Sequence, residues 1–300
     1  MKSGTDHVFG QSDNRQTWSV PDFVFGITRR SPTFAVGASI VLLLLLAAIF
    51  ADVISPFNPT LAFPYEVLKA PGGKFLLGTD GNGMDVLSRV IHGTRYAFGI
   101  AVPAGLIMVL IGVPLGVIAG YKGGIIDEVL LRVLDVLRAF PSIILALAVV
   151  AATGSSLVNV VLVIGFLDSP IFARVVRAEV LTLRESTFVR AAIAVGNPPW
   201  RVMLVHILPN AILGATAQLP IRMAWAVRIS ATLAFIGVGV QAPAPEWGAM
   251  IRQGAEYVIS GEWWVATFPG LGLIGLVLGF NLLGDGLTDL LDPRRKQIGK

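Results

Sequence analysis

The feature that most constrains this chain is a series of continuous apolar runs, each long enough to cross a lipid bilayer. A spanning helix needs about 20 predominantly apolar residues, and the first run contains VLLLLLAAIF at positions 41–50. The runs lack the period-two alternation of membrane strands, so we predict an all-α membrane protein with about six transmembrane helices. The spans are expected at 34–54, 96–119, 133–152, 157–173, 211–240 and 265–287.

The composition of the 300 residues agrees with a membrane protein and argues against other classes. Hydrophobic residues make up 54% of the chain and charged residues only 14%, whereas a soluble domain is about 25% charged. The high apolar content excludes a disordered chain, and the absence of cysteine excludes a disulfide-stapled secreted domain. The first run follows a long polar leader and is too long for a signal peptide, so we do not expect it to be cleaved.

The distribution of lysine and arginine predicts that both ends of the chain face the cytoplasm. Six spans place both ends on the same side, and cytoplasmic loops carry an excess of basic residues. Of the 23 Lys and Arg residues, fifteen lie in the segments that this arrangement places inside: 1–33, 120–132, 174–210 and 288–300. Five lie in outer segments and three within spans. We therefore expect a polar cytoplasmic arm at 1–33, a periplasmic loop at 55–94 and a basic cytoplasmic tail at 288–300.

The inner loop 174–210 is too long and too patterned for a plain connector. Its first part suits an amphipathic helix with apolar residues at Val175, Val176, Val180 and Leu183. A second, short helix would carry Phe188, Ala191, Ala192 and Val195, and Gly196-Asn197-Pro198-Pro199 would end it. Such a helix is suited to docking in a groove of a partner. The alternative is an ordinary solvated helix.

Several stretches of this sequence resemble one family of membrane proteins. VRAAIAVG (189–196) followed by HILPN (206–210) is similar to the cytoplasmic coupling motif of importer-type ABC permeases. The wider resemblance is to the "C" permease subunit of dipeptide, oligopeptide and nickel importers. It covers roughly residues 34–295 and includes LGTDGNGMDVLSRVIHGTR (77–95), GYKGGIIDEVLLRVLDVLRAFPSIILALA (120–148), AFIGVGVQAPAPEWGAM (234–250) and FNLLGDGLTDLLDPR (280–294).

The resemblance implies a type I ABC importer permease in the bacterial inner membrane, with a permease core of five helices at 95–287 after the first helix. Its implied partners are a sister permease, two ATPase subunits that hold ATP and Mg, and a periplasmic substrate-binding protein. The chain itself would bind no cofactor, and no nucleic acid is expected. The cargo would be di- or oligopeptides, with nickel or another small solute as the alternative. The implied ATPase-docking residues are Phe188, Arg190, Ala191, Ala192 and Gly196.

The sequence departs from the family pattern at three places. Arg190 stands where the family usually has a glutamate before the two alanines, which reverses a charge on the docking helix. The glutamate that commonly precedes a Leu-Ser-Phe-Leu-Gly stretch is replaced around 227–230. Asp168 takes a position at which an aromatic residue is more usual. These changes leave the scaffold intact but bear on partner and substrate identity.

Three charged residues within the predicted spans are candidates for the translocation pathway. A charge at mid-span costs roughly 2.5–3.5 kcal/mol on insertion scales, so Asp168, Arg222 and Arg228 should face a cavity or a partner. The two arginines lie six residues apart, about 240° around a helix, and cannot share a face. We predict that Arg228 lines the pathway and meets a substrate carboxylate, while Arg222 pairs with Asp168 or with backbone carbonyls. The alternative is that both arginines are structural.

Glycines and tryptophans of the spans and outer loops suggest packing and anchoring roles. Gly112, Gly116 and Gly120 repeat at four-residue spacing, as do Gly275 and Gly279, which predicts close helix contacts. Tryptophans at 247, 263 and 264 are expected to anchor the spans at the membrane interface.

No catalytic or metal site is predicted. The chain has no phosphate-binding loop of the G-x-x-x-x-G-K-[ST] type, so ATP hydrolysis is expected on separate subunits. His7, His92 and His206 are scattered and there is no cysteine, so no metal-ligand cluster is visible. An alternative from a different class is a secondary transporter or an intramembrane enzyme, which would act without an ATPase.

Overall fold

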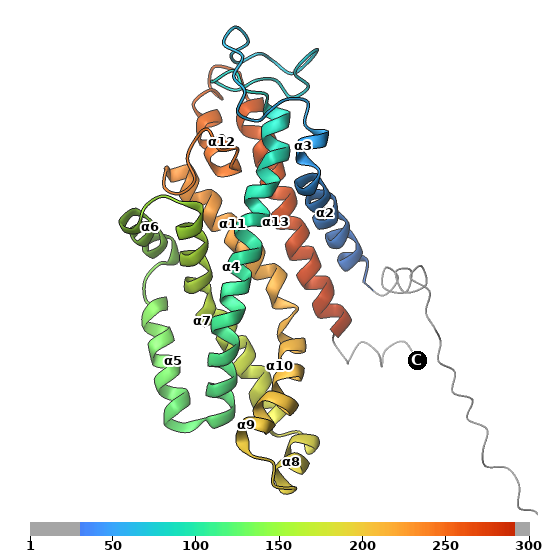
Figure 1. Ribbon diagram of the computed structural model, residues 1–300, viewed down its shortest axis with the longest axis vertical. Coiled ribbons are helices and arrows are strands. Elements are labelled where there is room, and N and C mark those ends of the chain that lie inside the picture. The colour runs from blue at the N-terminus through green and yellow to red at the C-terminus, as the bar shows by residue number, and fades with distance from the viewer. Residues whose placement is uncertain (1–30, 292–300) are drawn as a thin grey trace, which may run out of the picture.

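The computed structural model describes residues 31–291, which form a long bundle of helices joined by loops, without strands (Figure 1). Most of the predicted arm at 1–33 and of the tail at 288–300 lies outside the described residues. A loop-rich cap lies at one end of the bundle and the short helix α8 at the other. The helices are α2 (Pro32–Ile49), α3 (Ala51–Ile54), α4 (Val86–Lys122), α5 (Gly124–Arg138), α6 (Ser142–Thr153), α7 (Leu157–Arg184), α8 (Thr187–Ala194), α9 (Pro199–Arg201), the π-helix η1 (Val202–Ile207), α10 (Leu208–Ala215), α11 (Gln218–Ile236), α12 (Trp247–Ala255) and α13 (Trp264–Leu291).

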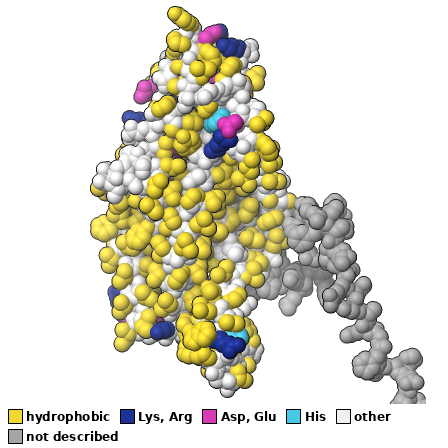
Figure 2. Space-filling view, viewed as in Figure 1, with side chains coloured by type: hydrophobic (Ala, Val, Ile, Leu, Met, Phe, Trp, Pro, Cys, Tyr) yellow, Lys and Arg dark blue, Asp and Glu magenta, His cyan; other side chains and the backbone are white. Residues whose placement is uncertain are grey.

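The number of spans agrees with the prediction. Within residues 31–291, five helices are long and apolar enough to cross a membrane, namely α2, α4, α7, α11 and α13. The bent pair α5–α6 provides a sixth if it counts as one span. On the face shown in Figure 2, hydrophobic side chains cover the middle of the molecule and charged ones gather toward its two ends. The prediction of an all-α membrane protein is thus confirmed.

The third span is not the continuous helix predicted at 133–152. The chain bends by 78° between α5 and α6, where Pro141 precedes the first residue of α6. A proline has no N–H to continue the helical bonding and disfavours helical angles in the residue before it, so the helix ends there. Two ion pairs hold α5 against α7: Arg177 donates to both oxygens of Asp127, and Arg174 contacts Asp135.

Other helix boundaries also differ from the prediction. Helix α4 has 37 residues, about 55 Å at 1.5 Å per residue. It begins at Val86 because the Asp85 carboxylate accepts a hydrogen bond from Ser88 N at 2.8 Å, so the loop predicted to end at 94 ends earlier. Helix α7 joins the predicted fourth span and the separate amphipathic helix into one continuous helix of 28 residues. The fifth span is divided into α10 and α11.

A row of glycines lets α4 and α7 pack closely. A Cβ atom on Gly116 would lie 2.5 Å from Ala173 O, and one on Gly120 would lie 2.8 Å from Val180 Cβ. A Cβ atom on Gly112 of α4 would likewise lie 3.0 Å from Ser169 O of α7. The close contact predicted for this glycine repeat is confirmed, and it places the backbones of two long spans against each other.

The second predicted repeat is only half correct. A Cβ atom on Gly279 of α13 would lie 2.8 Å from Ile40 Cγ2 of α2, so this glycine does lie at a helix contact. A Cβ atom on Gly275 would meet nothing within 4 Å among the described residues. Gly37 of α2 lies at the same contact, since a Cβ atom on it would be 2.4 Å from Leu283 N of α13.

The loop at 55–85, called the cap below, is held by a buried arginine. Arg89 is 1% exposed, and its Nε lies 3.3 Å from Asp80 Oδ2. Its Nη1 donates to Pro59 O in the cap and to Pro243 O in the loop before α12, at 3.1 Å each. One buried cation therefore connects the start of α4 to two segments that are distant in the sequence.

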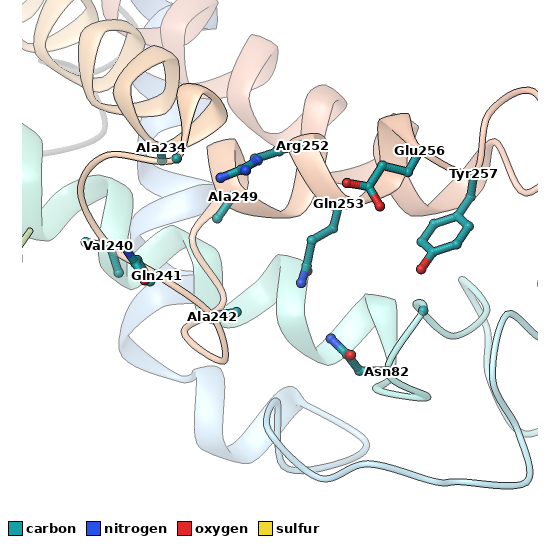
Figure 3. A pocket seen from close by; sticks show the side chains of 12 residues that line it. Asn82, Ala234, Val240, Gln241, Ala242, Ala249, Arg252, Gln253, Glu256 and Tyr257 are labelled. Atoms are coloured by element: carbon teal, nitrogen blue, oxygen red, sulfur yellow. The ribbon is translucent and has the colours of Figure 1, made fainter. Parts of the chain in front are cut away.

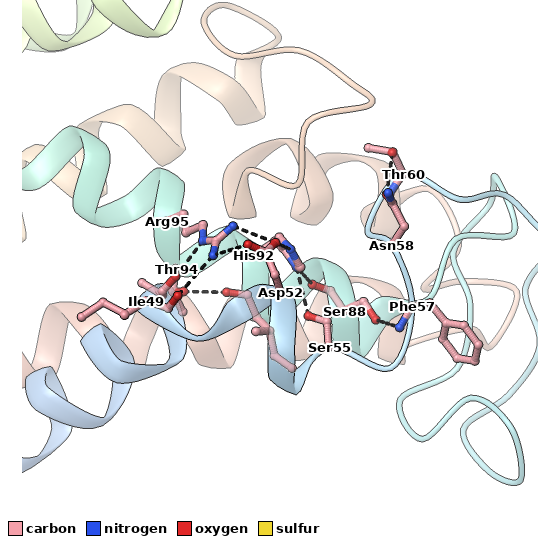
Figure 4. A network of polar contacts seen from close by, with 12 residues as sticks. Ile49, Asp52, Ser55, Phe57, Asn58, Thr60, Ser88, His92, Thr94 and Arg95 are labelled. Carbon is pink, nitrogen blue, oxygen red and sulfur yellow. Dashed lines mark hydrogen bonds and ion pairs between the residues drawn. The ribbon is translucent and has the colours of Figure 1, made fainter.

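A second polar network connects α3 to α4 near the cap (Figure 4). Both Nη atoms of Arg95 donate to the Asp52 carboxylate at 2.9 Å. His92 Nε2 lies 3.2 Å from Asp52 Oδ1, and its Nδ1 lies 3.1 Å from Ser55 Oγ. The hydrogen bonds from Arg95 and then from His92 lower the pKa of Asp52 below its usual value. This network fixes the chain where it leaves α2.

Two of the three outer tryptophans do not anchor spans at the membrane interface, contrary to the prediction. Trp247 is 2% exposed and its Nε1 donates to Val90 O of α4 at 3.1 Å. Trp264 is 7% exposed and its Nε1 donates to Thr79 O of the cap at 3.1 Å. Each indole N–H has found a buried acceptor within the protein, which satisfies its polar group. Trp263 is 51% exposed, as an interfacial residue should be.

Candidate coupling and translocation sites

The segment around α8 projects beyond the ends of the long helices (Figure 1). Helix α7 ends at Arg184, and after a short turn α8 runs from Thr187 to Ala194. Gly196 adopts a φ of +83°, which L side chains rarely accept, and Asn197 Nδ2 donates to Ala192 O at 2.9 Å. The predicted short helix and its stop at Gly196 are confirmed. Local turn chemistry therefore presents a two-turn helix at this end of the bundle.

Helix α8 rests on the bundle through one face and exposes the other. Val189 is fully buried and Ala192 is 7% exposed, and Val189 joins an apolar cluster with residues of α4, α7, η1 and α10. Of the predicted docking residues, Phe188, Arg190, Ala191 and Gly196 are exposed. Ala192 is not, so it supports the helix instead of presenting a contact surface. Val195, predicted to belong to the short helix, lies just after its last residue and is 79% exposed.

A concave surface of about 640 Å³ lies beside α8, between it and the turn that joins α4 to α5. Its lining carries more positive than negative charge: Tyr121, Lys122, Ile126, Arg184, Glu185, Arg190, Ile193 and Pro199. Within residues 31–291, Arg190 makes no ion pair. The α8 end thus offers exposed apolar side chains beside unpaired positive charge, a combination suited to a partner with an acidic, apolar cleft.

The predicted intramembrane charges are brought together only in part. Asp168 of α7 is 3% exposed, and Arg222 Nη1 of α11 lies 3.5 Å from its Oδ1. The expected pairing of these two residues is present. The other oxygen, Oδ2, is buried and has no hydrogen-bond partner in the described part of the chain. Arg228 is exposed, on a different side of α11, as the six-residue spacing requires.

Asp168 also borders a pocket of about 280 Å³ that the sequence did not reveal. The pocket lies where the chain bends between α5 and α6, and its lining includes Arg138, Pro141, Ser142, Asp168 and Trp225. Irregular backbone at membrane depth is tolerated only where it lies within protein or lines a watery cavity. The bend and the charges beside it therefore belong on a protein-facing or water-facing side. In the sequence, Pro141 was the available indication of a bend. Residue spacing could not predict which residues of α7 and α11 line the pocket beside it.

Comparison with known proteins identifies the family to which the chain belongs. A family described as the binding-protein-dependent transport system inner membrane component matches residues 112–297, and the N-terminal TM domain of oligopeptide transport permease C matches residues 27–71. The dipeptide transport system permease protein DppC of Alkalihalophilus pseudofirmus is 40% identical over 261 residues, which cover 87% of this chain and 86% of that protein.

Two further relatives show similar coverage. The glutathione transport system permease protein GsiD of Pectobacterium atrosepticum is 40% identical over 265 residues, which cover 87% of each chain. The di/tripeptide transport system permease protein DppC of Pseudomonas aeruginosa is 38% identical over 266 residues, covering 87% of this chain and 88% of that one. The chain therefore belongs to the family of inner-membrane components of binding-protein-dependent transport systems, and it is an ABC transport permease, not an enzyme.

Proposed function

We propose that this chain is one membrane-spanning subunit of an ATP-driven importer of di- and oligopeptides in a bacterial inner membrane. It would form the pathway with a sister permease, with both termini in the cytoplasm, two ATPases at the α8 end and a periplasmic binding protein at the cap end. The observation that supports this proposal most directly is the short helix α8, which projects beyond the ends of the spanning helices in a chain whose relatives are permeases. The relatives named for dipeptides, glutathione and di/tripeptides favour peptides over nickel as cargo.

The packing of α8 supports a role in transmitting force. Val189 is fully buried in a cluster that also contains Val180 of α7 and Ile207 of η1. An ATPase that moves α8 would displace these packed side chains too, because a close-packed interior transmits strain. The ATPases would bind ATP and Mg, and this chain would convert their closure into helix movement and alternating access.

The sidedness can be tested by cysteine labelling, because the natural chain contains no cysteine. Val195→Cys lies at the α8 end and Tyr65→Cys at the cap end, and the two positions are 79% and 100% exposed. A membrane-impermeant maleimide should label Tyr65→Cys in intact spheroplasts and Val195→Cys only after lysis. The reverse pattern would overturn the proposed orientation.

ATPase docking can be tested on the same positions. A bifunctional cross-linker should join Val195→Cys to an ATPase subunit that copurifies with the chain, while Tyr65→Cys should give no such product. Phe188→Ala should reduce both ATP hydrolysis and uptake of a radiolabelled dipeptide by the assembled transporter. Unchanged uptake and hydrolysis in this variant would show that the exposed face of α8 is not the docking surface.

A pathway role for Arg228 is the second part of this proposal. Its side chain is exposed on a spanning helix, so in the assembled protein it needs either a partner subunit or water. If it meets a substrate carboxylate, Arg228→Gln should lower uptake in a correctly assembled complex. Unchanged uptake across several peptides would remove it from the pathway. Uptake by the chain alone in liposomes, without any ATPase, would instead favour the secondary-transporter alternative.

A further inference from the structure

A polar pocket of about 360 Å³ lies at the cap end (Figure 3), at the opposite end of the bundle from α8 (Figure 1). It is formed by the end of α11, the loop that follows it, α12 and the turn of the cap at 81–82. Its volume falls in the range of small-molecule sites, about 300–1,000 Å³. The polar side chains that line it are Asn82, Gln241, Arg252, Gln253, Glu256 and Tyr257.

Two glycines make room for the side chains that shape this pocket. Gly237 ends α11 with a φ of +96°, and a Cβ atom there would lie 2.1 Å from Arg252 Nη1. A Cβ atom on Gly81 would lie 2.3 Å from Tyr257 Oη. Any other residue at either position would displace the arginine or the tyrosine, so both side chains are seated by the backbone opposite them.

Buried contacts hold the remaining walls in place. Arg89 donates to Pro243 O and fixes the loop between α11 and α12. The Glu246 carboxylate is 4% exposed and accepts a hydrogen bond from Ala249 N at 2.7 Å, which starts α12. Trp247 Nε1 binds Val90 O of α4. Hydrogen bonds to other parts of the protein therefore hold the segments that form the pocket, as a binding site requires.

The charges of the pocket are not used by the chain itself. Arg252 and Glu256 lie four residues apart, the spacing at which helical side chains can pair. Nevertheless, neither forms an ion pair with the other or with any other residue in the described part of the chain. In Figure 3 the Arg252 guanidinium and the Glu256 carboxylate lie to either side of Gln253. The pocket thus presents one cation and one anion apart from each other, with amides between them.

This pattern is complementary to a short zwitterion. An extended di- or tripeptide spans at most about 7–11 Å between its ends. The Cβ atoms of residues four apart on a helix are about 5–6 Å apart, and the two long side chains diverge from there. We propose that this pocket binds short peptides in their zwitterionic form, with Arg252 meeting the terminal carboxylate and Glu256 the terminal ammonium. This inference rests on the proposed function, because it assumes that peptides reach the cap end.

The test is direct peptide binding to the complete transporter in lipid nanodiscs without its binding protein, measured by saturation-transfer NMR. The probes are trialanine, its C-terminal amide and its N-acetyl form. The wild type should bind trialanine best. Arg252→Gln should weaken trialanine about tenfold, a loss usual for a charged hydrogen bond, and should leave the amide unchanged. Glu256→Gln should act in the same way on trialanine and leave the N-acetyl form unchanged.

Lys69→Gln removes a charge from the same end of the molecule but outside the pocket, and it should alter none of the three affinities. Equal weakening of all three peptides by Arg252→Gln, or no effect on any, would overturn the inference. Loss of assembly in Arg252→Gln, seen by size-exclusion chromatography, would assign the arginine to a subunit contact and would also overturn it. Peptide import by the wild-type transporter is measured separately, so failure of the proposed function is distinguishable from failure of this site.

Discussion

The contact between α4 and α7 makes a quantitative prediction about Gly116. A Cβ atom at this position would lie 2.5 Å from Ala173 O and 2.7 Å from Val176 Cβ, whereas ordinary contact begins near 3.4 Å. Gly116→Ala must therefore move the two helices apart by about 1 Å locally. A gap of 0.5–1 Å forfeits about a quarter to a half of each dispersion contact along the interface. The overpacked interface should cost about 1–3 kcal/mol, against a gain of up to about 1 kcal/mol from helix propensity.

A matched control isolates the packing part of this change. Gly99 lies in the same helix, and a Cβ atom there would meet nothing within 4 Å among the described residues. Gly99→Ala should therefore show the propensity gain alone. The assay is thermal unfolding of the detergent-solubilised transporter, followed by fluorescence-detected size-exclusion chromatography. Gly116→Ala should melt at a lower temperature than Gly99→Ala, and equal melting temperatures would refute the idea that glycine at 116 is needed for close approach.

Three further predictions concern buried charges. Burial raises the pKa of Glu246 to about 7, although Ala249 N and Gly248 N donate to it. This pKa exceeds that of the unfolded chain. The contribution of the Glu246 carboxyl group to the free energy of unfolding is therefore full below about pH 4.5 and is lost as the pH rises through 7. The wild type should therefore lose up to about 3 kcal/mol of stability relative to Glu246→Gln between pH 4.5 and 8, and a difference in melting temperature that stays constant with pH would contradict this. Asp168→Asn leaves Arg222 beside a neutral amide and should lower the melting temperature by the equivalent of about 3 kcal/mol, with the double variant carrying Arg222→Gln recovering most of it. Asp80→Ala removes the partner of a buried guanidinium and should make the cap sensitive to limited proteolysis, and a cap as resistant as in the wild type would show that its backbone acceptors suffice.

Features that depend on neighbouring residues in the chain were predictable. The spans were predictable from the length of the apolar runs, and within residues 31–291 five long apolar helices and one bent pair agree with that prediction. The short helix before Gly196 follows from glycine and proline chemistry. The resemblance carried by 189–196 and 206–210 indicated the family that the comparisons confirm. One contact between distant segments, the pairing of Arg222 with Asp168, was also expected, because charges at membrane depth need partners.

Other features that depend on which distant segments meet were not predictable. A run such as 133–152 is apolar throughout, so hydropathy alone cannot report the bend at Pro141. Trp247 is of a residue type that often anchors spans at the membrane interface, and it is buried only because α12 lies against α4. The pocket at the cap end draws on segments more than 150 residues apart, because Asn82 and Arg252 line one pocket only after the cap folds onto α12. The pattern of apolar residues in a helix reflects the surroundings of that helix alone, whereas the burial of a side chain by another helix and the closure of a pocket depend on how helices pack against one another.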